Sequence, residues 1–160
     1  LALAAVLDEF ALAEKITLKW PNDVLLGGAK CAGILLENLG AQLSVGIGVN
    51  IVSAPSDLPY PVARLVDHTH TCPAPQQLAM RLDHYFWTFH SQWRAQGFPP
   101  IRDAWLARAS GLGGEITARL PNDEFTGVFE GLDETGALIL RTPAGRRTIT
   151  AGDVYFAPKP

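Results

Sequence analysis

The dipeptide Gly27-Gly28 is the feature that most constrains how this chain can fold. Apolar runs flank it on both sides, at 24–26 and 31–36. Two consecutive glycines readily accept the positive backbone angles that a tight two-residue hairpin turn requires. The sequence therefore predicts an antiparallel hairpin built from residues 24–26 and 31–37.

Polar residues stand directly before this hairpin, in the stretch Lys19-Trp20-Pro21-Asn22-Asp23. Pro21 fixes its own φ angle and restricts the residue before it, so the chain enters the hairpin through a stiff connection. Asn22 and Asp23 then place two short polar side chains at the start of an apolar strand. Asx residues after proline commonly form turns, so a turn and a ligand site both remain open at this position.

The second strand of the hairpin carries one lysine, Lys30, among small and apolar residues. A buried ammonium group is costly without a partner, so Lys30 is expected either to reach solvent or to bind an anion. Gly33 follows three residues later and leaves space for close approach of a ligand. In the next apolar run, Gly46 and Gly48 alternate on one face and offer a slot without side chains, and Asn50 offers an amide with both donor and acceptor. Close helix–sheet packing is the simpler alternative for the two glycines, and a strand-terminal turn is the simpler alternative for Asn50.

Hydrophobic periodicity predicts the remaining elements. We expect a helix that ends near Lys15, a strand at 16–20 and a third buried strand at 43–51. A longer helix from Pro75 to Gly97 carries an apolar stripe that is expected to pack in the core, and a short helix follows at 101–108. From Leu112 onward, turn clusters recur about every ten residues, which is typical of a small barrel. Its strands are predicted at 115–120, 125–132, 137–142, 147–151 and 154–156.

Composition excludes several classes of protein. The net charge of −3 argues against general nucleic-acid binding, and the cluster Arg141, Arg146 and Arg147 is interpreted as a solvated turn. No uninterrupted apolar run reaches the roughly 18 residues of a membrane-spanning helix. The two cysteines, Cys31 and Cys72, lack metal-ligand spacing, so reduced thiols in a cytoplasmic protein are expected. Neither the four histidines nor any Ser-His-Asp set supports a metal or triad site.

The segment from Lys19 to Glu37 resembles the central K-W-P-N-D…K-x-x-G-I-L-x-E motif of biotin protein ligases. Residues 44–50 are similar to the later G-x-G-[IV]-N strand of that family, and residues 112–156 to its closing barrel. The resemblance implies an α+β fold. Residues 1–110 would be the C-terminal portion of a catalytic domain like that of class II aminoacyl-tRNA synthetases, with a mixed sheet and helices. Residues 111–160 would be a small Src-homology-3-like β-barrel domain.

The same resemblance implies an ATP-dependent ligase that joins biotin, through biotinyl-5′-adenylate, to a lysine of a biotin carboxyl carrier protein, the acetyl-CoA carboxylase subunit. Its cofactors and substrates would be ATP, biotin and Mg²⁺. Lys30 would be the catalytic residue, and Asp23 would offer a carboxylate to Mg²⁺. The residues expected to contact biotin or nucleotide are Lys19, Trp20, Asn22, Asp23, Gly33, Gly48 and Asn50. From the residues alone, Trp20 is as readily a core aromatic as a pocket wall.

Biotin protein ligases also carry a glycine- and arginine-rich loop upstream of the central motif, and no such loop stands in this sequence. The chain is therefore interpreted as the C-terminal part of such an enzyme. Whether it is active by itself is left open. Ala157 occupies the place where some members have an arginine. Two alternatives remain: a lipoate-type acyl-adenylate ligase, and a truncated non-catalytic module that docks a carrier domain and forms a homodimer through a strand edge. Comparing free lipoate with free biotin as substrate distinguishes a lipoate ligase from a biotin ligase.

Overall fold

The predicted hairpin is present in the computed structural model, which describes residues 1–11 and 15–156. Its strands are β2 (Asp23–Leu26) and β3 (Ala29–Asn38), which pair antiparallel from Asp23 opposite Gly33 to Leu26 opposite Ala29. Gly27 and Gly28 form the turn with φ angles of 58° and 86°. Both angles are positive, as a two-residue hairpin turn of this type requires. The hairpin prediction is therefore confirmed.

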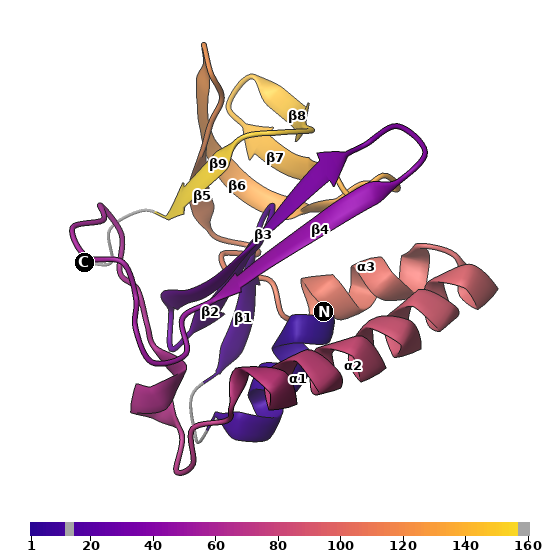
Figure 1. Ribbon diagram of the computed structural model, residues 1–160. Helices are drawn as coiled ribbons and strands as arrows, with labels where there is room; N and C mark the ends of the chain where they lie inside the picture. Colours follow the sequence, from indigo (N-terminus) through magenta and orange to yellow (C-terminus); the bar gives the residue numbers. More distant parts are fainter. Residues whose placement is uncertain (12–14, 157–160) are drawn as a thin grey trace. The chain divides into compact units, whose positions relative to one another are not determined.

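The other elements lie close to the predicted ranges (Figure 1). In the sheet region they are α1 (Ala2–Phe10), β1 (Ile16–Lys19), β4 (Leu43–Val49) and the short 3₁₀ helix η1 (Leu65–His68). Two helices follow, α2 (Pro75–Gln96) and α3 (Pro99–Leu106). The barrel strands are β5 (Glu115–Arg119), β6 (Glu124–Leu132), β7 (Leu138–Thr142), β8 (Gly145–Ile149) and β9 (Asp153–Phe156).

The chain divides into two structural units. The sheet unit contains residues 1–18 and 22–90, and the barrel unit contains Lys19–Pro21 and the chain from Ser91 onward. The sheet unit holds a four-stranded sheet in the order β1-β2-β3-β4, in which β2, β3 and β4 pair antiparallel. The barrel unit holds a five-stranded sheet in the order β8-β7-β6-β5-β9. Helices combined with two such sheets confirm the α+β class.

The core of the sheet unit is smaller than the sequence suggests. It is built from one face of α1 and from the first strands, with Leu7, Val24 and Cys31 fully or almost fully buried. By contrast β4 has no buried residue, and Leu43 and Val45 are 60% and 44% exposed. The prediction of a buried third strand is therefore wrong: an apolar sequence is necessary for burial, but another layer must also cover it. The first helix ends at Phe10 rather than near Lys15, and residues 12–14 lie outside the described part.

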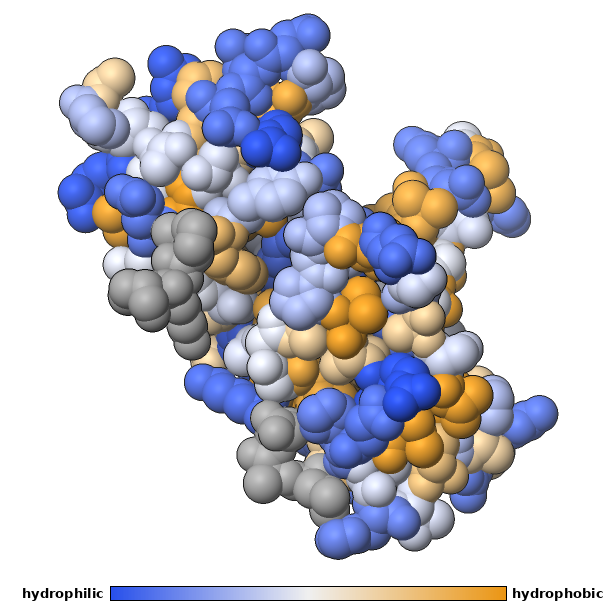
Figure 2. All heavy atoms as spheres, turned by 90° about the vertical axis from the view of Figure 1, so that its left-hand side faces the viewer, coloured by the Kyte–Doolittle hydropathy of each residue, from blue (hydrophilic) through white to orange (hydrophobic). Residues whose placement is uncertain are grey.

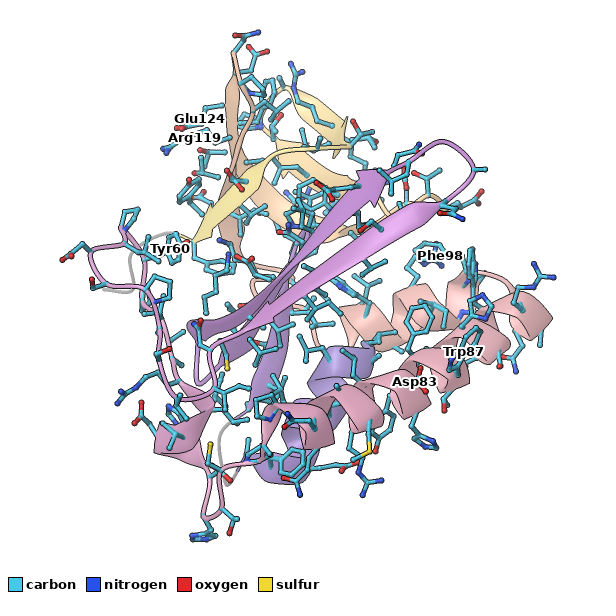
Figure 3. The ribbon with its side chains drawn as sticks, in the orientation of Figure 1. Tyr60, Asp83, Trp87, Phe98, Arg119 and Glu124 are labelled. Carbon is cyan, nitrogen blue, oxygen red and sulfur yellow. The ribbon has the colours of Figure 1, made fainter. Side chains whose placement is uncertain are left out.

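The aromatic stripe of α2 differs from prediction in the same way. Leu78 is the buried residue of this helix, whereas Phe86, Trp87 and Trp93 are about half exposed. Over its first half, α2 lies beside α1 (Figure 1), and the Tyr85 hydroxyl donates a hydrogen bond to Glu9 at 2.7 Å. Figure 3 shows Trp87 and Asp83 on this helix. Helical periodicity identified the helix correctly, but it did not show how much of the stripe another element covers.

The barrel unit has a hydrophobic core of its own. Its buried cluster contains Ile116, Phe129, Leu138 and Leu140, and it includes Trp20 at 6% exposure. On its surface, the predicted basic cluster has its own counter-ion. The guanidinium Nε atoms of Arg141 and Arg146 donate to the two carboxylate oxygens of Glu130 at 2.7 and 2.6 Å. These two hydrogen bonds hold the pKa of Glu130 below its usual value, and the bond from Arg146 has the larger effect.

Candidate functional site

A pocket of about 600 Å³ opens in the sheet unit between the hairpin and the loop that follows β4. Its lining combines β3, the end of β4 and the loop 53–62: Lys30, Ala32, Gly33, Gly48, Val49, Asn50, Ser53, Ala54, Pro55, Leu58, Tyr60 and Val62. Figure 2 views the molecule from the side on which this loop lies and shows apolar and polar side chains mixed on that face. The volume lies within the range typical of small-molecule sites.

Lys30 is held in place by backbone contacts. Its amide donates to the Pro61 carbonyl at 2.9 Å, and its own carbonyl accepts from the Ala63 amide at 2.9 Å. The side-chain amide of Asn50 donates to the same carbonyl at 3.2 Å. Residues far apart in sequence therefore meet at Lys30. Its side chain extends from a main chain that these hydrogen bonds hold in place.

The Lys30 ammonium has a carboxylate partner. Its Nζ lies 2.6 Å from Asp23 Oδ1, and the two side chains are 29% and 12% exposed. Gly33 stands opposite Asp23 in the sheet, and a Cβ there would lie 3.3 Å from Lys30 Cε and 3.6 Å from Asp23 Oδ1. The absence of a side chain at Gly33 is therefore what leaves room for this ion pair.

The two strand glycines form a bare floor. Gly33 pairs with Gly48 across β3 and β4, and a Cβ at Gly48 would meet no atom within 4 Å. Two residues opposite each other in an antiparallel pair point to the same face. The floor beside Lys30 thus lacks side chains on two adjacent strands, and a flat ligand can lie against the backbone there.

The structure brings together part of the predicted site. The residues that line the pocket include Lys30, Gly33, Gly48 and Asn50. Asp23 does not line it but forms an ion pair with Lys30, which does. Three further predicted residues are not among the lining residues of the described pocket. Asn22 donates from Nδ2 to the Ile34 carbonyl at 2.7 Å, and Trp20 packs in the barrel core. The Lys19 ammonium lies 5.6 Å and 5.9 Å from the ring centres of Tyr155 and Phe156.

Tyr60 is a site residue that the sequence reasoning missed. It stands on the loop 53–62 (Figure 3), and its ring centre lies 5.5 Å from Lys30 Nζ, within cation–π range. Pro59 and Pro61 flank it and predicted only a loop. The contact depends on the pairing of Val62 with Lys30. No local sequence pattern predicts a pairing between residues so far apart in the sequence.

The described residues also bear on clusters of metal ligands and on helices that could span a membrane. In residues 1–11 and 15–156, no group of three or more His, Cys, Asp or Glu side chains is arranged to hold a metal ion. None of the helices in the described part is long and apolar enough to cross a membrane. Ala157 lies outside the described residues.

Cys31, next to Lys30, is fully buried, and desolvation raises the pKa of its thiol from 9.0 to about 11. We expect iodoacetamide at pH 8 to alkylate the partly exposed Cys72 and to spare Cys31 until the protein is denatured, because the thiolate is the reactive form. Intact mass should show one adduct per folded chain and two after denaturation.

The same pKa shift predicts how the stability of the fold depends on pH. Because the folded pKa of Cys31 is raised, its contribution to the free energy of unfolding is present below about pH 9 and is lost as the pH rises toward 11. A Cys31→Ala variant should lack that alkaline loss.

The chain, which has a lysine-bearing pocket in its sheet unit and a small barrel unit, is similar in sequence to known ligases. Residues 111–157 match the family described as Biotin protein ligase C terminal domain. The chain is 43% identical to the biotin–[acetyl-CoA-carboxylase] ligase of Paracoccus denitrificans, over 97% of this chain and 70% of that protein. It is 31% identical to the bifunctional ligase/repressor BirA of Bacillus subtilis, over 96% of this chain and 51% of that protein.

Solved structures agree in fold. The apo biotin protein ligase from Aquifex aeolicus superposes with a TM-score of 0.86 at 22% identity, over 98% of this chain and 72% of that one. The same enzyme in complex with biotin and ATP gives 0.83 at 24% identity, over 96% and 66%. This chain belongs to the biotin protein ligase family. It spans about half the length of the Bacillus relative and more than two thirds of the Paracoccus one.

Proposed function

We propose that this chain carries out ATP-dependent ligation of biotin to a lysine of a biotin carboxyl carrier protein of acetyl-CoA carboxylase. In the first reaction, a biotin carboxylate oxygen attacks the α-phosphorus of ATP and pyrophosphate leaves, which gives biotinyl-5′-adenylate. In the second, the carrier lysine amine attacks the acyl carbon, AMP leaves and the amine loses a proton. The observation that carries this proposal is the Lys30 ammonium on the bare glycine floor of the pocket.

Lys30 supplies what the first reaction needs from the protein. Negative charge builds on the phosphate oxygens as the carboxylate attacks, and a fixed ammonium in a partly enclosed site stabilises that charge without reorganisation. Hydrogen bonds with the Pro61 carbonyl, the Ala63 amide and the Asn50 side-chain amide hold the main chain of Lys30. Orientation and charge stabilisation then supply the rate enhancement. The buried and protonated thiol of Cys31 is unsuited to act as a nucleophile.

The pocket suits the groups of both substrates. Asn50 keeps its side-chain oxygen as an acceptor after donating to Lys30, which fits the exocyclic amine of a purine. Gly33 and Gly48 allow a planar base to approach the backbone. Asp23 offers one carboxylate to Mg²⁺, which is usually held by one or two carboxylates, substrate phosphates and water.

Lys19, Trp20 and Asn22 were expected to contact ligand as well. The partners that the structure gives them favour structural roles instead. Asn22 fastens the start of β2 to β3, whereas Lys19 and Trp20 pack in the barrel unit. We therefore assign ligand binding to Lys30, Gly33, Gly48, Asn50 and Asp23.

The decisive experiment is the intact mass of a purified biotin carrier domain after incubation with this chain, biotin and Mg-ATP. A gain of one biotin supports the proposal. A parallel incubation uses a version of the chain extended upstream to the length of the Paracoccus relative, and free lipoate replaces biotin in a third. Transfer by the extended version alone places the missing requirement upstream. Transfer of lipoate in place of biotin, or no transfer by either version, contradicts the proposal.

Filling the floor of the pocket should block nucleotide binding. A Gly48→Val side chain enters open space, so we expect the fold to persist while the affinity for ATP falls at least about tenfold. Isothermal titration calorimetry with ATP measures the loss. Gly46→Val is the matched control, because Gly46 lies on the same strand but is not among the lining residues of the described pocket. An equal loss of affinity in both variants would contradict the proposed floor.

Association of two copies is a further part of the proposal. The far end of the β3–β4 hairpin exposes apolar side chains, with Leu35 at 61%, Leu36 at 58% and Leu39 at 65%. Exposed apolar residues gathered on one hairpin favour association, and sedimentation velocity over a concentration series tests a homodimer. The free cysteines support a cytoplasmic location.

A further inference from the structure

A short segment of the sheet unit, residues 61–66, connects the end of the pocket loop to the 3₁₀ helix η1. We call it the crossing segment, because it contacts β3 first and the end of β4 next. At β3 the Lys30 amide donates to the Pro61 carbonyl, and the Ala63 amide donates to the Lys30 carbonyl, both at 2.9 Å. The crossing segment therefore holds Lys30 from both sides of its main chain.

The crossing segment then contacts the chain directly after β4. The Leu65 amide donates to the Asn50 carbonyl at 2.8 Å, and the Val66 amide donates to the Ile51 carbonyl at 2.9 Å. A third link closes the arrangement, because the Asn50 amide donates to the Cys31 carbonyl at 2.8 Å. Main-chain hydrogen bonds thus join β3, the end of β4 and the crossing segment pairwise at the wall of the pocket.

Leu65 is the side chain that fixes the crossing segment in the interior of the sheet unit. It is 0% exposed, and the only other buried side chain of the segment is the small Ala63. Arg64 points outward and donates to the Asp67 carboxylate through two hydrogen bonds of 2.8 Å on the surface. A buried leucine makes many apolar contacts that a shorter side chain loses, so the place of the segment depends mainly on Leu65.

Leu65 is close enough in the chain to act on two pocket residues at once. Ala63 and Leu65 are two residues apart, so the main chain between their bonds to Lys30 and Asn50 spans at most about 7 Å. A displacement of Leu65 is therefore passed to both. We propose that Leu65 is a positioning residue, through which the interior of the sheet unit sets the main-chain positions of Lys30 and Asn50. The consequence for ligand binding rests on the function proposed above, but the positional coupling does not.

The variant Leu65→Ala tests the coupling, because it removes the buried side chain and keeps every main-chain donor and acceptor. We expect the Ala63 amide, whose acceptor is Lys30, to exchange with deuterium at least about tenfold faster. Leu7→Ala is the matched control, since Leu7 is an equally buried leucine of the sheet unit that does not line the described pocket. It should also melt earlier, but with unchanged exchange at Ala63 when each variant is measured equally far below its own melting temperature.

ATP binding supplies a readout that loss of stability alone does not move. In the version of the chain that transfers biotin, the dissociation constant for ATP should rise at least about tenfold in Leu65→Ala. Under the same conditions Leu7→Ala should stay within about twofold of the unaltered chain. Leu65→Met nearly restores the buried volume, so it should return both the exchange at Ala63 and the affinity for ATP to the values of the unaltered chain.

Equal exchange at Ala63 in Leu65→Ala and Leu7→Ala would overturn the proposal and leave Leu65 a core residue only. Faster exchange with unchanged affinity for ATP would overturn its role at the pocket. Should Leu65→Ala fail to fold, Leu65→Val removes less volume and should speed exchange in the same direction, with Leu7→Val as its control. Faster exchange in a chain that binds no ATP even when unaltered and extended would support the coupling and contradict the proposed function, so the two can fail separately.

Discussion

Replacing Lys30 with alanine should lower the rate of biotinyl-adenylate formation by about a hundredfold or more, with little loss of stability. The removed ammonium is the cation that the pocket presents to the developing phosphate charge, and the loss of one such preorganised group typically costs a factor of about 10² to 10³. The Lys30 side chain is 29% exposed and its ion pair with Asp23 is therefore partly screened by solvent, so its loss should cost on the order of 1 kcal/mol. Single-turnover release of pyrophosphate, measured on the version of the chain that transfers biotin, provides the rate.

Lys15→Ala is the control, because Lys15 is an exposed lysine that precedes β1 and does not line the described pocket. Its rate should equal that of the unaltered chain. A normal rate in Lys30→Ala would remove Lys30 from the mechanism. A rate that falls only in proportion to the folded fraction, measured by calorimetry, would reduce Lys30 to a structural residue.

Replacing Gly127 with alanine should unfold the barrel unit at ordinary temperature, or destabilise it by about 3 kcal/mol or more. A Cβ on this buried residue of β6 would collide with the Arg141 carbonyl oxygen and would lie 3.2 Å from Leu140 Cγ. The obstacle is backbone of the neighbouring strand β7, which pairs with β6 from Val128 to Leu132. The barrel cannot yield there without losing that pairing, and calorimetric unfolding measures the cost.

The same substitution at Gly46 is the comparison. A Cβ there would lie 3.7 Å from the nearest atom, which is ordinary van der Waals contact. Gly46→Ala should therefore change the melting temperature little. Equal effects at the two positions would mean that strand glycines are costly to replace for a general reason, and not because of the close approach of β7 at Gly127.

The sequence predicted the elements of this fold because their signals are local. Gly27 and Gly28 define a turn by their backbone freedom alone, and the recurring turn clusters after Leu112 give the barrel strands to within a few residues. Burial was predicted less well. Leu43 and Phe86 have the residue types of a core and are exposed, because burial depends on which other segment covers a surface.

The site shows the same division. Lys30 and Gly33 were recognisable from one strand, since a lysine among small residues and a glycine three positions later are neighbours in sequence. The Tyr60 contact and the hydrogen bond between Lys30 and Pro61 depend on the pairing of Lys30 with Val62, 32 positions later in the sequence. Trp20 was ambiguous for a related reason: the other residues of its buried cluster lie between positions 116 and 154, beyond the reach of any local pattern.

The placement of the four tryptophans has a spectroscopic consequence. Trp20 is buried in the barrel core and the partly buried Trp105 packs against that core, whereas Trp87 and Trp93 on α2 are more than half exposed. Indole emission shifts to the blue in apolar surroundings, and exposed indoles are quenched by acrylamide. Fluorescence that survives acrylamide therefore reports Trp20 and Trp105 without added label, and it follows the barrel while the light from α2 is suppressed.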